Sequence, residues 1–165
     1  AFLGLGMVYG ILDEAEIRRG MAELKKETDL IIVNIHWGVE YQHYFNSVQQ
    51  KAGRLLVDSG AELVIGHHPH VVQGLEIYQG KPIFYSLGNF IFDQYFSADV
   101  KNGLAVAVDY TRTDVSFNLI PFKNVNGQAA FLAGWEKEQA LNNIAAWSPN
   151  LSAGDREKIK QGRWP

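Results

Sequence analysis

The sequence predicts a mixed α/β domain, and three observations support this prediction. A helix and a strand–helix–strand unit are indicated in the amino-terminal part of the chain, and several short strand-like runs follow them. All five histidines lie in the segment from His36 to His70, around the predicted ends of two buried strands. The chain has 165 residues, 47% of them hydrophobic, which is enough to bury the core of one domain.

The composition excludes several classes of protein. The charged fraction of 20% is too low, and the aromatic fraction of 12% too high, for an intrinsically disordered segment. Nucleic-acid-binding domains are usually strongly basic, whereas this chain has a net charge of −3, so no nucleic-acid partner is expected. The chain has no cysteine, which excludes disulfides, thiolate metal ligands and a cysteine nucleophile. Any metal ion must therefore be held by histidine and oxygen ligands.

The first residues form an apolar run that predicts a buried strand at residues 1–5. The run is too short to span a bilayer and lacks a basic leader, so no signal or transmembrane segment is predicted in this chain. Because the sequence starts with Ala1 inside an apolar stretch, we expect it to be the carboxyl-terminal part of a larger or processed protein.

Residues 13–27 are predicted to form an amphipathic helix. Acidic residues lie in its first turn and lysines in its last, as the helix dipole favours. Its apolar residues repeat at helical spacing, and they are Ile17, Met21 and Leu24. Residues 30–35 follow as a β-branched run, which is typical of a strand buried on both faces.

A second helix is predicted after a polar loop at residues 39–46. It is expected to begin at Ser47, because Gln50 completes a capping-box pattern, and to end before Gly60. Its buried face is expected to consist of Val48, Ala52, Leu55, Leu56 and Ser59. Residues 61–65 predict a second buried strand, and a right-handed crossover through the helix makes the two strands parallel.

The remaining sequence predicts further strands and a helical tail. Residues 88–102 are predicted to be a long aromatic loop, and another strand is expected at residues 124–133, across Asn126 and Gly127. Residues 133–165 form a mostly polar tail with a weak helical pattern, and residues 1–165 are interpreted as a single domain. A turn is predicted at residues 111–113. Strand character is shared by residues 71–78, 81–87, 103–111 and 114–122.

The histidines give the strongest functional signal. His36 follows the first strand of the unit, and His67, His68 and His70 follow the second. Because the carboxyl ends of parallel strands meet at one sheet edge, the two groups are expected to converge. Pro69 disfavours the α conformation at His68, so an extended backbone is expected, with His68 and His70 on one side and His67 on the other. Imidazole is a common ligand of zinc, iron and manganese, so a metal or catalytic site is predicted.

Other polar residues near this site leave alternatives open. Glu40 is a metal ligand, a carboxylate that orients an imidazole, or a solvated loop residue. Asn89 closes the segment 86–89, which either offers polar groups to a substrate or forms a structural turn. His43 is interpreted as a loop residue outside the site. The sequence contains no glycine-rich phosphate loop and no G-x-S-x-G elbow.

Three motifs occur in a set order: HWGVEY at residues 36–41, GHHPHV at 66–71 and YSLGNF at 85–90. Together they resemble the bacterial CapA-type capsule-synthesis family, which is named for poly-γ-glutamate capsule production and is similar to the calcineurin-like metallophosphoesterases. The resemblance covers residues 1–110. It implies a metallophosphatase-like sandwich of two mixed β-sheets flanked by helices, with a metal site at the strand ends.

The resemblance also implies roles for the histidines. His36, His68 and His70 would be metal ligands, with His67 competing with His68 because the histidine is doubled there. One or two divalent ions (Mn, Fe or Zn) would activate water and stabilise phosphoryl oxygens. His67 or His70 would act as the catalytic acid that protonates the leaving group. A phosphate-containing or polymer-precursor small molecule is the implied substrate.

The family's upstream half is absent from this sequence. That half carries a Gly-Asp at a strand end, an Asn-Leu-Glu and an Asn-Asn-His. Here the only Gly-Asp is at residues 154–155 in the tail, and Asn142-Asn143 is followed by Ile144. A complete two-metal site is therefore expected to need ligands from outside this chain.

The resemblance leaves two main functional hypotheses. One is a protein of extracellular polymer synthesis or export with metal-dependent phosphoesterase chemistry when the upstream half is present. The other is a non-catalytic accessory or scaffold subunit with a vestigial site. Both imply a bacterial cell-envelope or extracellular location, other capsule-synthesis subunits as partners, and membrane contact only through an anchor outside this chain. An intracellular metal-dependent hydrolase unrelated to capsule is a weaker third option.

Overall fold

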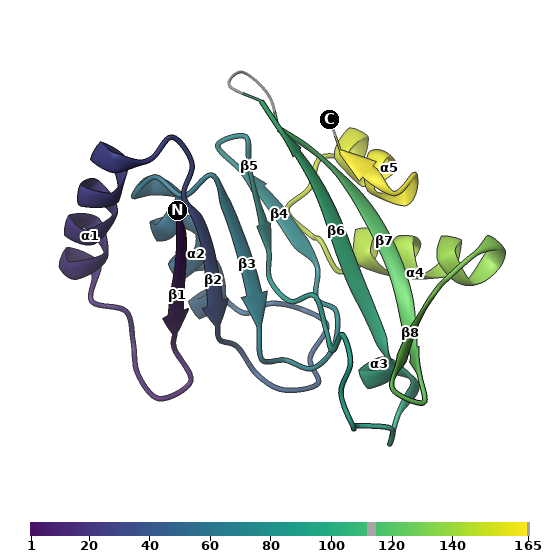
Figure 1. The fold of residues 1–165 in the computed structure, drawn as a ribbon. Helices are drawn as coiled ribbons and strands as arrows, with labels where there is room; N and C mark the ends of the chain where they lie inside the picture. Colours follow the sequence, from purple (N-terminus) through teal and green to yellow (C-terminus); the bar gives the residue numbers. More distant parts are fainter. Residues whose placement is uncertain (112–114, 165) are drawn as a thin grey trace.

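Two β-sheets and their flanking helices make up the fold in the computed structural model, which describes residues 1–111 and 115–164 (Figure 1). The predicted turn at residues 111–113 lies mostly outside the described residues. The first sheet has five strands in the order β1-β2-β3-β5-β4. Its strands are β1 Phe2–Gly6, β2 Ile32–His36, β3 Leu63–His67, β4 Leu75–Tyr78 and β5 Lys81–Phe84.

The strand–helix–strand unit has the predicted parallel pairing. β2 is parallel to β1 and to β3, and β3 is parallel to β5, whereas β4 is antiparallel to β5. The register places Gly6, His36 and His67 side by side at the carboxyl ends of their strands. The topology therefore brings the two groups of histidines to one edge of the sheet, as expected.

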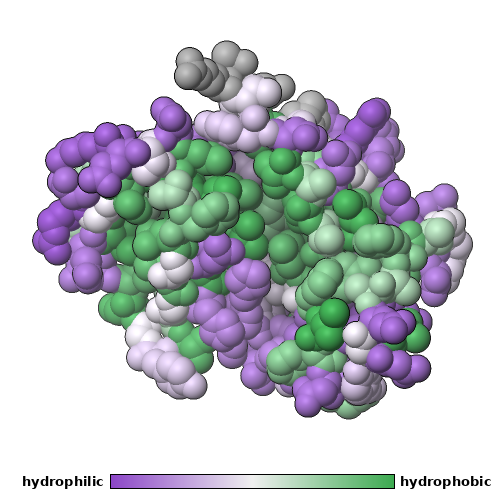
Figure 2. All heavy atoms as spheres, viewed as in Figure 1, coloured by the Kyte–Doolittle hydropathy of each residue, from purple (hydrophilic) through white to green (hydrophobic). Residues whose placement is uncertain are grey.

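The prediction that the first strand is buried is wrong. β1 is an edge strand, paired only with β2, and its residues alternate between exposed and partly buried. Leu3 and Leu5 pack against the core, whereas Phe2 on the opposite face is 80% exposed. Figure 2 shows apolar side chains gathered over β1 to β3 on this face. The apolar run therefore indicates a strand correctly, but one face of that strand is exposed.

Two helices cover the other face of the first sheet. α1 spans Glu14–Glu27, and the side chain of Asp13 caps it by accepting a hydrogen bond from the Glu16 amide. α2 spans Ser47–Asp58. Its capping residue is Asn46 rather than Ser47, because Asn46 accepts from two backbone amides and Gln49 returns the capping-box bond.

The buried face of α2 differs from the predicted one. Val48, predicted to be buried, is 58% exposed. The residues that α2 buries are Gln49, Ala52, Gly53, Leu56 and Val57. Together with Ile17 and Met21 of α1, the apolar ones among them form one core cluster with the strands of the first sheet.

The second sheet is antiparallel, whereas the resemblance implied a mixed one. β6 pairs with β7, and β7 pairs also with β8 and β9, in each case antiparallel. The predicted tail contains two helices that pack beside this sheet (Figure 1). The strands of the second sheet are β6 Asn102–Tyr110, β7 Val115–Val125, β8 Gln128–Phe131 and β9 Arg163–Trp164. The helices of this part of the chain are the short α3 Ala98–Lys101 before the sheet, and α4 Gly134–Ala146 and α5 Ala153–Lys160 in the tail.

A second core cluster connects the two sheets. Leu63 of β3 and Phe84 of β5 share this cluster with Phe117 of β7 and Leu141 of α4. The architecture is thus an α/β fold with two sheets flanked by helices, as predicted. Among the helices that the structure describes, none is long and apolar enough to cross a membrane.

Candidate functional site

Four histidines line one hollow at the carboxyl edge of the first sheet. The hollow has a volume of about 310 Å³, and Asn89, Phe90 and Phe92 line it together with the histidines. The histidines are His36 at the end of β2, His67 at the end of β3, and His68 and His70 in the loop that follows. Ligands bind at this edge in open α/β sheets, so the location suits a functional site.

His36 and His68 form the closest pair. His36 Nε2 lies 3.1 Å from His68 Nδ1, and the ring centroids are 4.7 Å apart. The ring of His70 lies farther away, with its centroid 6.2 Å from that of His68. The structure therefore brings together two of the predicted ligands closely and places the third at the rim of the same hollow.

The backbone after β3 differs from the extended conformation that we expected. His68 has a φ angle of 100° and His70 one of 61°, both in the left-handed region. The chain reverses direction directly after β3, and the left-handed residues turn it back so that the His68 ring meets His36. Such conformations cost about 1–3 kcal/mol each and cluster at functional sites.

His67 does not lie on the opposite side from His68. It continues β3 on the same face as its registered neighbour His36, so it lines the hollow as well. Its Nε2 atom lies 3.5 Å from the Oδ1 atom of Asn34, two residues before His36 on β2. Sequence reasoning missed Asn34, although a polar residue inside a β-branched run, on the same strand face as His36, is a usable signal.

Asn89 orients His70. The amide nitrogen of Asn89 donates to the carbonyl of Val100 at 3.1 Å and to Gln94 at 3.2 Å, which directs its Oδ1 atom toward His70. His70 Nδ1 lies 2.9 Å from that oxygen. Since an amide oxygen only accepts, Nδ1 carries a proton, and in the neutral ring Nε2 keeps its lone pair. Glu40 Oε1 lies 3.8 Å from this Nε2 atom, on a side chain that is 48% exposed.

The donor chemistry of the hollow fits a divalent metal ion. Nitrogen ligands lie about 2.0–2.1 Å from zinc, so two ligands of one ion are about 3 Å apart, as His36 Nε2 and His68 Nδ1 are. His70 offers a third lone pair, and Glu40 offers a carboxylate. Within residues 1–111 and 115–164, however, no three histidine, aspartate or glutamate side chains lie close enough together to hold a metal ion without rearrangement.

The surroundings of two of the histidines favour the neutral ring. The pKa of His67 is lowered by desolvation and, to a smaller degree, by the neighbouring His36. The pKa of His68 is lowered mainly by desolvation and also by His36 and His70, while Glu40 opposes the shift. Neutral imidazole is the form that binds metal ions, so the environment favours the ligand-competent state.

These lowered pKa values predict that acid destabilises the folded chain. An unfolded histidine has a pKa of about 6.5, so the unfolded chain binds protons at a pH where folded His67 and His68 do not. Their contribution to stability is therefore complete above about pH 6.5 and falls as the pH decreases. Urea unfolding at a series of pH values should show this slope, and it should be smaller in His67→Gln. An unchanged slope in that variant would contradict the assignment.

Aromatic side chains surround His70 at the mouth of the hollow. Tyr41 stacks on His70 with ring centroids 6.0 Å apart, and Phe92 lies at 5.3 Å. Phe96 meets the edge of Tyr41 at 5.4 Å. The loop predicted at residues 88–102 therefore supplies an aromatic rim to the site, together with Tyr41 from the loop before α2.

These features define the chain as an α/β protein with a histidine cluster at the carboxyl edge of parallel strands. Residues 7–94 match the family described as bacterial capsule synthesis protein PGA_cap. The chain belongs to this family, and the predicted resemblance is confirmed.

Known relatives match just under half of the chain. The PGA biosynthesis protein CapA of Bacillus subtilis is 49% identical over 74 residues, which are 45% of this chain and 20% of that protein. The capsule biosynthesis protein CapA of Bacillus anthracis is 44% identical over 79 residues, or 48% and 19% of the two chains. A probable polyglutamine synthesis accessory protein of Mycobacterium tuberculosis is 35% identical over 69 residues, or 42% and 18%. The chain thus spans about a fifth of the length of these relatives.

Proposed function

We propose that this chain is part of a CapA-type protein that acts in the synthesis or export of a bacterial extracellular polymer, with poly-γ-glutamate capsule as the first candidate. Membership of the capsule-synthesis family and the names of the two Bacillus relatives support this role. The proposal places the protein at the cell envelope or outside the cell, with other capsule-synthesis subunits as partners.

The chemistry we propose is metal-dependent hydrolysis of a phosphate ester at the histidine hollow. The observation that carries it is the pair His36 and His68, whose ring nitrogens are 3.1 Å apart at the carboxyl ends of parallel strands. With His70 they would hold one or two divalent ions, and ligands outside this chain would complete the set. A bound ion supplies a Lewis acid for phosphoryl oxygens and lowers the pKa of water at the site.

The side chains of the hollow have distinct tasks in this proposal. Asn89 holds the proton on His70 Nδ1 and so leaves His70 Nε2 free for coordination. The lowered pKa of His67 favours its neutral ring, which suits it to accept a proton near the reacting group rather than to act first as the acid that the resemblance implied. The aromatic rim of Tyr41 and Phe92 limits water around the substrate, a phosphate-containing or polymer-precursor small molecule.

Metal titration tests this proposal on the 165-residue chain. Calorimetry with Mn²⁺ and Zn²⁺ is expected to show weak binding, and His36→Ala or His68→Ala should weaken it at least about tenfold. The matched control is His43→Gln, which removes an imidazole that does not line the hollow. Binding that survives both alanine variants, or that is lost only in the control, would show that the hollow is not the metal site.

A second candidate is a non-catalytic accessory role. The observation that favours it is that, among the described residues, no three metal-ligating side chains lie close enough together to hold an ion. The mycobacterial relative is itself named an accessory protein. No detectable binding of Mn²⁺ or Zn²⁺ by the complete protein, with its upstream part present, would support this role and contradict the enzymatic one.

A further inference from the structure

The face of the first sheet that is turned away from α1 and α2 is only partly covered. Phe2 of β1, Ile32 of β2 and Leu63 of β3 are registered neighbours in one row across this face. Phe2 is 80% exposed, Ile32 is partly buried and Leu63 is only 4% exposed. The second sheet therefore covers this face over β3 and leaves it open toward β1, where apolar side chains gather on the surface (Figure 2).

Strand β6 forms an open edge of the second sheet on the side of this face (Figure 1). Its outer side is paired at its start, where the Leu104 amide donates to the Leu87 carbonyl at 2.9 Å. Backbone groups point alternately to the two sides of a strand, so the N–H and C=O groups of Val106 and Val108 also point outward. Within residues 1–111 and 115–164, these outward groups have no partner. Such an edge is a template for another strand.

The side chains of β6 become more exposed along the strand. Leu104, Val106 and Val108 share one face of β6, because side chains alternate along a strand. Leu104 is buried between the sheets, Val106 packs against the same core cluster as Leu63, and Val108 is 37% exposed. Val108 lies in the second half of β6 and Phe2 at the start of β1, which are at the same end of the molecule in Figure 1. The exposed apolar groups of the two sheets are therefore on the same side.

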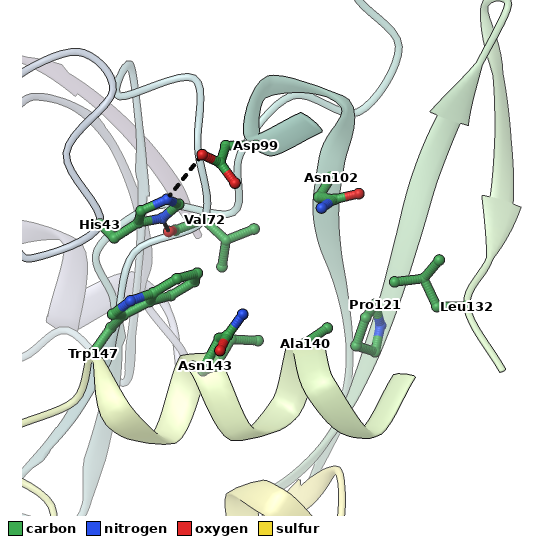
Figure 3. A pocket seen from close by; sticks show the side chains of 11 residues that line it. His43, Val72, Asp99, Asn102, Pro121, Leu132, Ala140, Asn143 and Trp147 are labelled. Carbon is green, nitrogen blue, oxygen red and sulfur yellow. Dashed lines mark hydrogen bonds and ion pairs between the residues drawn. The ribbon is translucent and has the colours of Figure 1, made fainter. Parts of the chain in front are cut away.

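The opposite end of the second sheet differs. It ends in β8 and β9, which have four and two residues, and such short edge strands offer little backbone for pairing. α4 lies beside β7 there, and Ala140, Pro121 and Leu132 line one small pocket of about 60 Å³ (Figure 3). The long uncovered edge and the uncovered apolar face are thus both on the β6 side of the molecule.

One added strand would satisfy the edge and cover the face. Neighbouring strands lie about 4.7–4.9 Å apart, so a strand paired with β6 extends the second sheet toward β2 and β1, and its inward side chains contact Ile32 and Phe2. The matches to the two Bacillus relatives cover 20% and 19% of those proteins, so most of a relative's length lies outside the matched segment. A relative therefore has ample chain to supply such a strand.

We propose that the outer edge of β6 and the apolar face over β1 and β2 form a docking surface for a β-strand from the part of the full-length protein outside these 165 residues. The strand pairs with the outward backbone groups of Val106 and Val108 and alternates apolar and polar side chains, the apolar ones covering Phe2 and Ile32. Leu104 also lines the histidine hollow, so the docked strand runs next to that site. The open edge and exposed face call for a cover even without a metal site.

Residue-resolved amide hydrogen exchange tests this proposal on the full-length protein and on the 165-residue chain, both in EDTA. We expect the amides of Val106 and Val108 to exchange at least about a hundredfold more slowly in the full-length protein. The Ala107 amide is the internal control, because it points toward β7 and should be slow in both proteins. Equal exchange of Val106 and Val108 in the two proteins would overturn the proposal, whatever the outcome of the metal titrations.

Proline substitutions test the same edge. Val108→Pro removes an outward N–H, so it should leave the thermal midpoint of the 165-residue chain nearly unchanged but lower that of the full-length protein by at least about 5 °C. Ala107→Pro removes a bond to β7 and should lower both midpoints. Phe2→Ala should lower the midpoint only in the full-length protein, and Phe131→Ala, at an exposed phenylalanine of β8, is its matched control. No effect of Val108→Pro on the full-length protein would contradict the docked strand.

A second copy of the chain is the alternative occupant of this surface. Light scattering over a range of protein concentrations, combined with the exchange measurement, separates the two. Slow exchange at Val106 and Val108 in a monomeric full-length protein supports the proposal. Slow exchange that appears only when the protein dimerises would assign the surface to a second copy and overturn it.

Discussion

Replacement of Gly66 by alanine is expected to lower the free energy of unfolding by about 3 kcal/mol or more, at the upper end of overpacking effects. Gly66 lies in β3, one residue before His67. A Cβ atom at this position would be 2.0 Å from the Tyr85 carbonyl oxygen and 2.3 Å from Nε1 of Trp37. Both are rigid groups in the core, so the strand itself has to move.

The substitution should also disturb the histidine hollow. Trp37 Nε1 donates to the Tyr85 carbonyl at 2.8 Å, and this bond joins the segment after β2 to the end of β5 just below the site. An added methyl group separates the two partners and leaves a buried N–H without an acceptor. Metal affinity at the hollow should therefore fall together with stability.

Urea unfolding of Gly66→Ala and Gly4→Ala measures this effect. Gly4 is the matched control, because it is a strand glycine of the same sheet and a Cβ atom there meets nothing within 4 Å. We expect Gly4→Ala to change the free energy of unfolding by less than about 1 kcal/mol. Similar losses in both variants would mean that the loss in Gly66→Ala comes from alanine in a strand rather than from the contacts of Gly66.

The elements set by local signals were predictable from the sequence. α1 is capped by Asp13 and ends at Glu27, as the positions of the acids, lysines and apolar residues indicated. α2 begins at Ser47 as predicted, but its capping residue is Asn46, because two overlapping capping patterns exist, Asn46 with Gln49 and Ser47 with Gln50. Only the packing of the buried Gln49, whose amide donates to Gln73 at 2.8 Å, selects between them.

Elements that depend on distant contacts could not be predicted in the same way. The strand expected at residues 71–78 begins only at Leu75. Before it, the side chain of Gln73 donates to the carbonyl of Gln42, and Gly74 lies so close to the Trp147 carbonyl that a Cβ atom would be 2.0 Å from it. The backbone of this segment still pairs with the residues after β5, through Gln73 N to Ser86 O at 3.0 Å and a bridge between Val72 and Leu87, but these contacts from other segments make the pairing irregular.

The candidate site shows the same division. Convergence of His36 with His67 and His68 follows from parallel strand order alone, which the sequence indicated. The orientation of each ring depends on the left-handed turn at His68 and on the Asn89 amide, which belongs to a loop after β5. Residues before proline prefer an extended backbone, but His68 takes a left-handed conformation in the turn after β3.

Replacement of Arg54 by methionine is expected to lower the free energy of unfolding by about 2–3 kcal/mol. Arg54 on α2 donates to Glu76 on β4 through Nε at 3.1 Å and also through Nη2. The Glu76 side chain is only 3% exposed, so the variant leaves a buried carboxylate without its cation. The loss is smaller than for a fully buried pair, because the Arg54 side chain is 40% exposed and water screens the interaction.

The double variant Arg54→Met/Glu76→Gln should recover much of that loss. A neutral glutamine leaves no buried charge, and its amide oxygen can still accept the bond that the Tyr85 hydroxyl now donates to Glu76 at 2.7 Å. A double-mutant cycle, with urea unfolding of both single variants and the double variant, isolates the coupling. Additive losses would show that Arg54 stabilises the chain through the contact of its guanidinium group with Tyr78, whose ring centroid lies 5.0 Å from the guanidinium carbon. Recovery in the double variant would show instead that the cation is retained because Glu76 is buried as a carboxylate.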